Sequence, residues 1–372
     1  MMQKINITYV LCKIGGYQQY CWVADALDKE RFNLSFIFLD ATTNTLKEIL
    51  TSKGFTCYQL DVKSKKDIPK AIYQTIQILK KEKTAVVHTH LVEASLIGLM
   101  AAKFLGIKKR IYTRHHADFH HLHYKKGVYI DNFINYLSTD IIAISKNVQQ
   151  VIKTKEKFHQ NKILLIYHGF DLTVFNQISS EDIALMQSKY NLHSSPVIGM
   201  VSRYETGKGI VYAIKAFEYL LKEYPNAILV IANAFGSDAE IIKQQLQKLP
   251  TSSYREIEYE HKINALYKCF DMLVHVPINP TYEAFGQVYI EAMAAGIPCV
   301  CTLSGIAVEY IENGKNAIVV DYENAEEIYE GMKIYINNSI FKQTIISTAK
   351  NDVQAIFGFD KMMSALNNLY LS

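Results

Sequence analysis

The segment EAFGQVYIEAMAAGIPCV, residues 283–300, predicts a turn, a helix and a buried strand in succession. Gly286 stands where the helix would open, and Gly296 is typical of the residue that follows a helix C-terminus. A helix N-terminus carries unpaired backbone N–H groups and a partial positive charge, so it favours an anion. Glu283 and Glu291 nevertheless place one carboxylate before the helix and another within it. The segment therefore combines an anion site with two acids.

Short apolar runs alternate with helical stretches on both sides of this segment. In the first half INITYVLC, NLSFIFLD and AVVHTH are typical strands, and in the second half VIGMVSR, AILVIAN and MLVHVP repeat the pattern. This alternation predicts parallel βαβ units in open sheets that are covered on both faces. The polar stretch 176–195 separates the halves, and we expect an irregular linker there. The sequence thus predicts two doubly wound α/β domains, which bind ligands at the carboxyl ends of their strands.

The composition is that of a globular protein long enough for two domains. The chain has 372 residues, of which 49% are hydrophobic and 20% charged. The formal net charge of +4 gives no argument for nucleic-acid binding. Six cysteines occur without a CxxC pair, which favours reduced core thiols in a cytoplasmic protein. We expect neither a signal peptide nor a membrane span.

Lysine and arginine residues are clustered in the first half of the chain. The clusters occur at residues 63–66, 80–83, 108–110, 125–126 and 153–157. They are either solvated helix ends and loops or a face that rests on anionic lipid. The second interpretation predicts peripheral contact with the inner face of a membrane.

The two acids have a chemical explanation. A carboxylate is the best acceptor for a pair of vicinal hydroxyls. Glu291 could therefore hold a ribose diol, and Glu283 could hold hydroxyls of a sugar beyond the phosphates. The backbone amides near Phe285 and Gly286 would then face the phosphates. One site would accommodate base, ribose, diphosphate and sugar.

The segment VSRYETGKG adds two cations at the start of the second half. Arg203 closes a strand and Lys208 precedes the next helix, so the pair is either a diphosphate clamp or two solvated charges. The chain contains no DxD pair, which often holds a divalent metal on a nucleotide diphosphate. Cationic side chains and helix N-termini would have to neutralise the phosphates instead.

EAFGQVYIEAMAAGIP resembles the E-x7-E signature of the family 4 glycosyltransferases, the large retaining GT-B group, and VSRYETGKG resembles that family's R…KG segment. IGGYQQY, with Gly15 and Gly16, is similar to the family's first glycine loop. HTH and YTRHH match its N-domain histidines, the second at His115, and SGIAVEYIENGKNAIVV matches its closing segment at Glu309. The matches keep the family's order through most of the chain. The departures from the family's usual residues are Tyr17, Gln18, His168 and His261.

The resemblance implies a GT-B fold, in which two Rossmann-like doubly wound domains face a central cleft. The N-terminal acceptor domain would span residues 1–178 and include a C-terminal crossover helix at about 356–372. The domain that binds the nucleotide sugar would span residues 190–355.

The resemblance also implies a retaining, metal-independent transfer from a nucleotide diphosphate sugar to a glycan or lipid-linked saccharide, in cell-surface polysaccharide biosynthesis. No cofactor and no metal are implied. The catalytic residues would be His115, Arg203, Lys208 and Glu283. The donor-binding residues would be Gly15, Gly16, Phe285, Gly286, Glu291 and Glu309.

Two other functions fit the same fold. A GT-B sugar-nucleotide epimerase or hydrolase is disfavoured by the E-x7-E and R…KG segments. A catalytically silent module that binds a glycan is disfavoured because it would not need all four of Arg203, Lys208, Glu283 and Glu291.

The stretch RHHADFHHLH, residues 114–123, holds five histidines and Asp118. Histidine is a common metal ligand, but the spacing matches no zinc motif. A loop that contacts phosphate or acceptor hydroxyls is the favoured interpretation, and a loop with no special role is the alternative. His115 is singled out by its place in the chain and not by the cluster.

Overall fold

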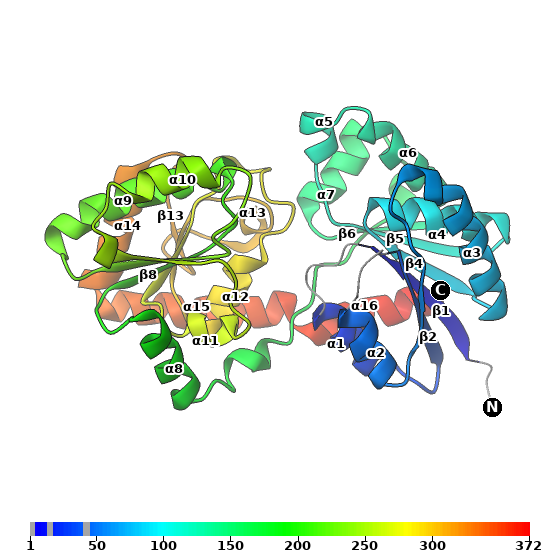
Figure 1. The fold of residues 1–372 in the computed structure, drawn as a ribbon, viewed down its shortest axis with the longest axis horizontal. Coiled ribbons are helices and arrows are strands. Elements are labelled where there is room, and N and C mark those ends of the chain that lie inside the picture. Colours follow the sequence, from blue (N-terminus) through cyan, green and yellow to red (C-terminus); the bar gives the residue numbers. More distant parts are fainter. Residues whose placement is uncertain (1–3, 13–17, 40–44) are drawn as a thin grey trace. The chain divides into compact units, whose positions relative to one another are not determined.

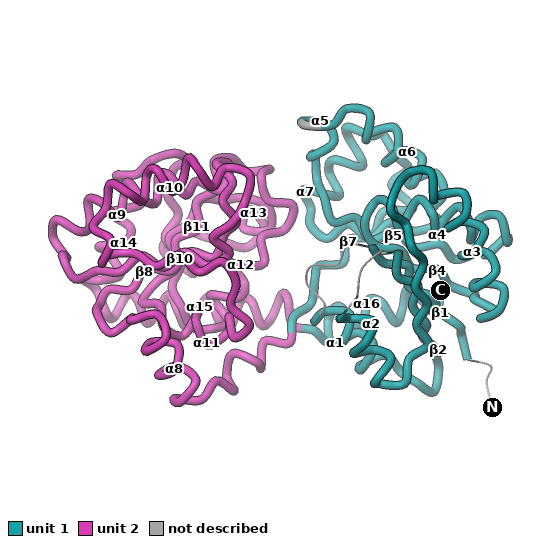
Figure 2. The backbone as a smooth tube through the Cα atoms, in the orientation of Figure 1, with its two compact units in different colours: residues 1–170, 359–372 teal, residues 171–358 magenta. Residues whose placement is uncertain are grey.

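The structure, a computed structural model, describes residues 4–12, 18–39 and 45–372. It forms two compact units, residues 1–170 with 359–372 and residues 171–358 (Figure 2). Each unit is an open, fully parallel β-sheet with helices on both faces (Figure 1). The prediction of two doubly wound α/β halves is confirmed. Gly15 and Gly16 lie outside the described residues.

Within the described residues, the sheet of the first unit has seven strands in the order β3-β2-β1-β4-β5-β6-β7. The strands are β1 (Ile5–Leu11), β2 (Phe32–Phe38), β3 (Thr56–Gln59), β4 (Val86–His90), β5 (Lys109–Arg114), β6 (Asp140–Ala143) and β7 (Ile163–Leu165). The helices are α1 (Gln18–Ala26), α2 (Thr45–Ser52), α3 (Ile68–Lys81), α4 (Val92–Phe104), α5 (Phe119–His123), α6 (Gly127–Leu137), α7 (Lys146–Gln150) and α16 (Phe359–Leu371).

Strand β1 shows why both faces of this sheet are buried. Tyr9 and Leu11 pack on one face against α1, α2 and α16, whereas Val10 packs on the other face against α3 and α4. Successive side chains of a strand point to opposite faces, so a strand covered on both sides must be apolar throughout. Helix α16 completes the first face with Met362 and Leu366. The C-terminal segment is therefore part of the first unit.

Residues 171–358 are all described, and their sheet has six strands in the order β10-β9-β8-β11-β12-β13. The strands are β8 (Val197–Val201), β9 (Ile228–Ala232), β10 (Tyr254–Ile257), β11 (Met272–His275), β12 (Cys299–Cys301) and β13 (Ile318–Val319). The helices are α8 (Ser180–Tyr190), α9 (Ile210–Glu223), α10 (Ala239–Leu246), α11 (Ile263–Tyr267), α12 (Gln287–Ala295), α13 (Ala307–Tyr310), α14 (Ala325–Asn337) and α15 (Ser339–Phe357).

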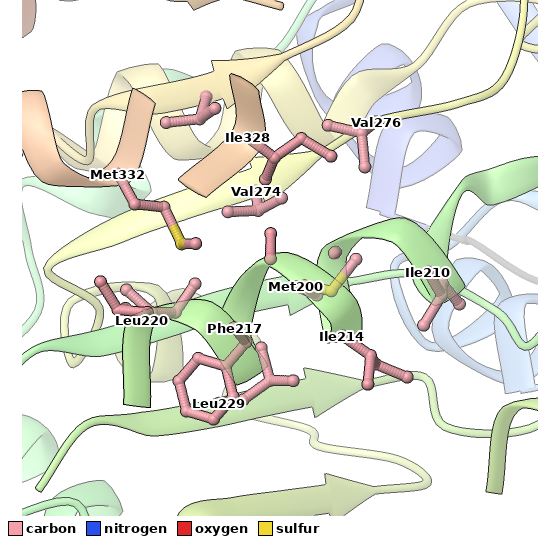
Figure 3. Packing of buried hydrophobic residues seen from close by; sticks show 14 of the residues in the cluster. Met200, Ile210, Ile214, Phe217, Leu220, Leu229, Val274, Val276, Ile328 and Met332 are labelled. Carbon is pink, nitrogen blue, oxygen red and sulfur yellow. The ribbon is translucent and has the colours of Figure 1, made fainter. Parts of the chain in front are cut away.

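The main core of the second unit lies between its sheet and helices α9 and α14. Figure 3 shows Phe217 of α9 and Met332 of α14 on the same side of the sheet as Met200 and Val274. All four side chains are fully or almost fully buried. At about 25 cal/mol per Å² of apolar area, such side chains each contribute roughly 2 kcal/mol. This packing fixes β8 and β11, whose carboxyl ends carry the candidate site.

The stretch 176–195 differs from the irregular linker that its polarity predicts. It contains helix α8 and belongs to the second unit. The side chain of Ser179 accepts a hydrogen bond from the backbone N–H of Asp182 at 3.1 Å, which caps the helix. Met186 is the buried residue of this helix, so the apolar periodicity that normally reveals a helix is nearly absent.

The six cysteines are free, in agreement with the prediction of reduced thiols, but only four are in the core, because Cys21 and Cys57 are half-buried. Among the described residues, no helix is both long and apolar enough to cross a membrane.

Candidate functional site

Helix α12 begins and ends at the two predicted glycines. Gly286 precedes it with φ of +87° and Gly296 follows it with φ of +77°. Both conformations lie in the left-handed region that glycine adopts without strain. A β-carbon on Gly286 would lie 3.5 Å from Cγ of Glu283. The first of the two acids is therefore next to the helix N-terminus.

Glu283 is the centre of a compact charged cluster. Lys208 Nζ lies 2.6 Å from Glu283 Oε1, and His275 Nε2 lies 3.1 Å from the same oxygen. The three side chains are largely buried, with 14%, 12% and 2% of the lysine, glutamate and histidine side chains exposed. Lys208 precedes α9, and His275 is the last residue of β11. The cluster thus forms at the carboxyl ends of two neighbouring strands, where doubly wound sheets bind ligands.

The pKa of Glu283 shows that this acid is ionised. Burial would raise the pKa, but the hydrogen bond from His275 and the charge of Lys208 outweigh burial and lower it to about 2. The carboxylate can only accept hydrogen bonds, so the bond places a proton on Nε2 of His275. Nδ1 of His275 is buried without a partner among the described residues.

Two glycines allow the backbone to approach this cluster closely. A β-carbon on Gly209, which has φ of +73°, would lie 1.8 Å from the carbonyl oxygen of Val276. A β-carbon on Gly305 would lie 2.7 Å from Cβ of Glu283 and 2.7 Å from the carbonyl oxygen of Phe285. No other residue fits such distances without moving the backbone. The loops around Lys208 and Glu283 are therefore held in place by tight packing.

Arg203 joins this cluster only through intermediates. Its Nη2 lies 3.1 Å from Oε1 of Glu205, and 58% of its side chain is exposed. The hydroxyl of Tyr282 donates to Glu205 at 3.1 Å, and Nζ of Lys208 lies 5.6 Å from the centre of the Tyr282 ring. The structure thus places Arg203 at the rim of the cluster and not beside Glu283.

Glu291 lies in α12, about one and a half turns from the start of the helix. Oε2 of Glu291 accepts a hydrogen bond from the hydroxyl of Tyr267 at 2.8 Å, and Oε1 accepts one from Nε2 of Gln287 at 2.9 Å. Burial raises the pKa of Tyr267 well above its ordinary value, so the hydroxyl keeps its proton and donates. The two bonds fix the carboxyl group in one orientation.

The pKa of Glu291 is shifted in the opposite direction to that of Glu283. Burial raises it to about 7, although the hydrogen bonds from Tyr267 and Gln287 partly oppose the shift. No lysine or arginine is paired with Glu291 among the ion pairs of the described residues. Two acids eight residues apart therefore differ in pKa because one faces a cation and the other does not. Perturbed carboxyl groups of this kind are concentrated at functional sites.

Two further predicted donor-binding residues, Phe285 and Glu309, belong to the second unit. Phe285 is buried with its ring 5.9 Å from that of Phe357, and its carbonyl oxygen accepts a hydrogen bond from the N–H of Ile306 at 2.7 Å. Its side chain packs in the core, so only its backbone can face a ligand. Glu309 lies in α13 and is half-buried.

His115 belongs to a separate cluster in the first unit. Nε2 of His115 lies 3.0 Å from Nδ1 of His90, and its ring is stacked on that of His168 with 5.3 Å between the centres. Nδ1 of His168 contacts Nε2 of Gln19 at 2.8 Å. His90 and His168 line a cavity of about 30 Å³ together with Tyr20 and other residues. His168, which differs from the family's usual residue at this position, therefore places another imidazole against His115.

These histidines are uncharged at neutral pH. Burial lowers the pKa of His115 and His90 well below the ordinary value, and the neighbouring histidines lower it further. Burial alone lowers the pKa of His168 to about 4. Neutral imidazoles can donate one hydrogen bond and accept another, as contact with sugar hydroxyls requires.

The sequence did not single out His275, Tyr267, Tyr282 and Glu205. His275 had a recognisable signal, because it is a polar residue at the carboxyl end of a buried strand. No sequence pattern indicated Tyr267, because it lies 24 residues before its partner Glu291.

Two parallel doubly wound units with an acid–lysine pair at the strand ends agree with a GT-B glycosyltransferase, and comparisons with known proteins show this class. The family model "Glycosyltransferase Family 4" matches residues 23–174, and "Glycosyl transferases group 1" matches residues 182–352. The chain belongs to the family 4 glycosyltransferases.

Relatives with assigned names are similar over most of their length. The capsular polysaccharide biosynthesis glycosyltransferase CapM of Staphylococcus aureus is 27% identical over 81% of this chain and 80% of its own. The UDP-Gal:alpha-D-GlcNAc-diphosphoundecaprenol alpha-1,3-galactosyltransferase of Escherichia coli is 23% identical over 81% and 79%. The structure of HepE from Anabaena with UDP-glucose has a TM-score of 0.84 and 19% identity, and covers 98% of both chains. This last likeness supports the fold.

Proposed function

We propose that the protein transfers a sugar, with retention of anomeric configuration and without a catalytic metal, from a nucleotide diphosphate sugar to a glycan or lipid-linked saccharide. The observation that carries the proposal is the Lys208–Glu283–His275 cluster at the N-terminus of α12, with Glu291 farther along the same helix. The cluster supplies a cation for the diphosphate and a carboxylate for sugar hydroxyls.

Each group around α12 is proposed to bind a different part of the donor. Lys208 and the amides of the first turn of α12 bind the diphosphate, and they stabilise the charge that develops as the sugar departs. Glu283 accepts hydrogen bonds from the donor sugar, and Glu291 accepts them from the ribose. The side chain of Arg203 is exposed at the rim of the cluster and contacts only the partly exposed Glu205 among the ion pairs of the described residues. It can therefore turn toward the phosphates when the donor binds. His115, in the first unit, contacts the transferred sugar.

The names of two relatives suggest the biological setting. The CapM name refers to capsular polysaccharide biosynthesis, and the Escherichia coli name refers to a diphosphoundecaprenol-linked acceptor and a UDP-linked donor. We therefore propose that this protein acts in cell-surface polysaccharide biosynthesis, and that uridine diphosphate sugars are the first donors to test.

Binding of the donor is the test of this proposal. The melting temperature of the purified protein would be measured with a panel of uridine, guanosine and adenosine diphosphate sugars in the presence of EDTA. At about 100 times its dissociation constant, the correct donor adds roughly 2.7 kcal/mol to the free energy of unfolding. We expect one donor to stabilise the wild type and to lose this effect in Glu291→Ala and Arg203→Ala. A panel with no stabilising donor would favour the silent module.

We also propose that the first unit contacts an anionic membrane through α6. Tyr129, Phe133 and Tyr136 are 77%, 41% and 59% exposed, and their i, i+4, i+7 spacing places them on one face of the helix. Lys125 and Lys126 are exposed just before this helix. Exposed aromatic rings next to lysines are typical of surfaces that rest at the lipid interface.

Co-sedimentation with liposomes tests this contact. The wild type is expected to pellet with phosphatidylglycerol liposomes at low salt and less at high salt, because lysine–lipid attraction is screened. Replacing Tyr129, Phe133 and Tyr136 together by serine is expected to abolish pelleting. Tyr73→Ser serves as the control, since Tyr73 is 63% exposed on α3. A wild type that ignores these liposomes at low salt contradicts the proposal.

A further inference from the structure

A second cluster of ionisable side chains lies in the first unit, on the loop after β5 and on helices α5 and α6. His116, His120 and Asp131 each offer one ligand atom, and these atoms lie within 4.8 Å of one another. His116 Nε2 is 3.2 Å and His120 Nδ1 is 2.7 Å from Oδ2 of Asp131. Figure 1 shows α5 and α6 as neighbouring helices of this unit. Three elements therefore meet at one carboxylate oxygen.

The burial of these groups shows that the arrangement is built into the fold. The side chain of Asp131 is fully buried, and 18% of His116 and 13% of His120 remain exposed. Gly127, at the start of α6, has no room for a β-carbon, which would lie 2.6 Å from the ring of His120. The backbone is thus shaped to bring His120 against α6.

One buried arginine faces two buried carboxylates in this region. Arg114 is fully buried, and its Nη1 and Nη2 each lie 2.7 Å from an oxygen of Glu156. This bidentate pair neutralises the arginine, which is 3.5 Å from Asp131. Asp131 is therefore a second buried carboxylate that shares a single arginine with Glu156. Buried charges are normally paired or bound to metals.

The hydrogen bonds of Asp131 are also uneven. Oδ2 faces both imidazoles and the arginine, whereas Oδ1 is buried without a partner among the described residues. A carboxylate that served only to orient two histidines would be expected to use both oxygens. The two imidazole nitrogens and this oxygen lie close enough together to share one cation.

From this geometry we propose that His116, His120 and Asp131 bind a divalent transition-metal ion of the zinc type. Zinc takes imidazole nitrogen and carboxylate oxygen at about 2.0–2.2 Å in a tetrahedral site, which separates ligand atoms by roughly 3.3 Å. The 3.2 Å between His116 and Asp131 already matches. The 2.7 Å between His120 and Asp131 is about 0.6 Å shorter, so the His120 ring has to move outward by about this much. Solvent supplies the fourth ligand at the exposed edges of the histidines.

The proposed ion is structural. It joins the loop that follows His115 to α6, and it compensates the buried charge of Asp131. It belongs to the first unit, whereas Lys208, Glu283 and Glu291 belong to the second. The proposed zinc site therefore does not take part in binding the donor, which is proposed to need no metal.

Zinc alone is the probe for this site. The full chain, purified without a polyhistidine tag and stripped with a chelator, would be titrated with Zn²⁺ by calorimetry, and retained zinc would be counted by mass spectrometry. We expect one zinc per chain and a higher melting temperature with zinc than without it. Removal of a ligand is expected to weaken binding at least about 100-fold, since even indirect partners change metal affinity by 10- to 100-fold.

Three variants decide the outcome. His120→Gln and Asp131→Asn are expected to lose both the bound zinc and the thermal shift, whereas His159→Gln keeps both, because His159 is an exposed histidine of the same unit. Should Asp131→Asn fail to fold, His120→Gln decides, since its side chain is at the edge of the buried cluster. A wild type that binds no zinc, or a His120→Gln variant that binds it unchanged, overturns the proposal.

Discussion

Lys208→Met is expected to lower the turnover number of the protein by about 10²–10³-fold. Removal of one preorganised donor from a developing negative charge costs this much in enzymes that rely on electrostatic stabilisation. The lysine is directed toward the N-terminus of α12 by its 2.6 Å contact with Glu283. The leaving diphosphate gains charge in the transition state, so the loss should appear mainly in kcat and less in KM.

The measurement is the release of nucleoside diphosphate from the stabilising donor, in EDTA, with lipid-linked saccharides as acceptors. Lys215→Met is the matched control, because Lys215 is 50% exposed on α9, pairs with Glu218 and lies over the ring of Tyr219, away from the cluster. It should retain full activity. Lys208→Met also leaves Glu283 with His275 as its partner and should lower the melting temperature, so the assay belongs well below that temperature. A rate within about threefold of the wild type contradicts the assigned role.

Glu291→Gln is expected to stabilise the protein at alkaline pH while weakening binding of the donor. Burial raises the pKa of Glu291 from 4.5 to about 7. The folded state therefore binds a proton that the unfolded state releases between these two values. The free energy of unfolding falls as pH rises through this window. Above pH 7 the folded wild type bears the full free-energy cost of a buried, ionised Glu291.

The uncharged glutamine avoids that cost. Its advantage over the wild type should be about 3 kcal/mol at pH 8 and less than about 1 kcal/mol at pH 5. Donor affinity should fall roughly 10- to 100-fold, because a hydrogen bond to a charged group contributes about 1.5–3 kcal/mol. Chemical denaturation at the two pH values and calorimetric titration with the donor measure the two effects.

Glu256→Gln is the control for Glu291→Gln. Glu256 also accepts a hydrogen bond from a buried tyrosine, Tyr204, at 2.8 Å, but Glu256 itself is exposed. Its replacement should leave the affinity for the donor unchanged. A Glu291→Gln variant that is destabilised at pH 8 and binds the donor normally would show that the acid has a structural role alone.

Local patterns in the sequence were sufficient to predict the fold and the limits of the key helix. Alternating apolar runs and helical stretches predicted both parallel sheets, and Gly286 and Gly296 marked the ends of α12. Helix α8 was not predicted because it buries little apolar surface, although Ser179 followed by Asp182 is a recognisable cap. Pattern arguments thus succeed where burial imposes a periodicity and fail where a helix lies on the surface.

The residues of the site could be predicted from the sequence, but the contacts between their side chains could not. Glu283 and Lys208 are 75 residues apart in the chain, and their contact depends on the order of strands β8 and β11 in the sheet. The same holds for Glu291 and its tyrosine. Arg203 has the expected residue type at the expected strand end, but its side chain contacts Glu205 instead. Side-chain pairing across loops depends on tertiary packing that a single sequence does not display.

The anomeric configuration of the product is the measurement that tests the account most directly. The donor that stabilises the protein would be incubated with the enzyme and an acceptor in EDTA, and the glycosidic linkage would be determined by nuclear magnetic resonance. The account predicts a sugar attached to the acceptor in the same configuration as in the donor. An inverted linkage, a free sugar or an epimerised donor would contradict it.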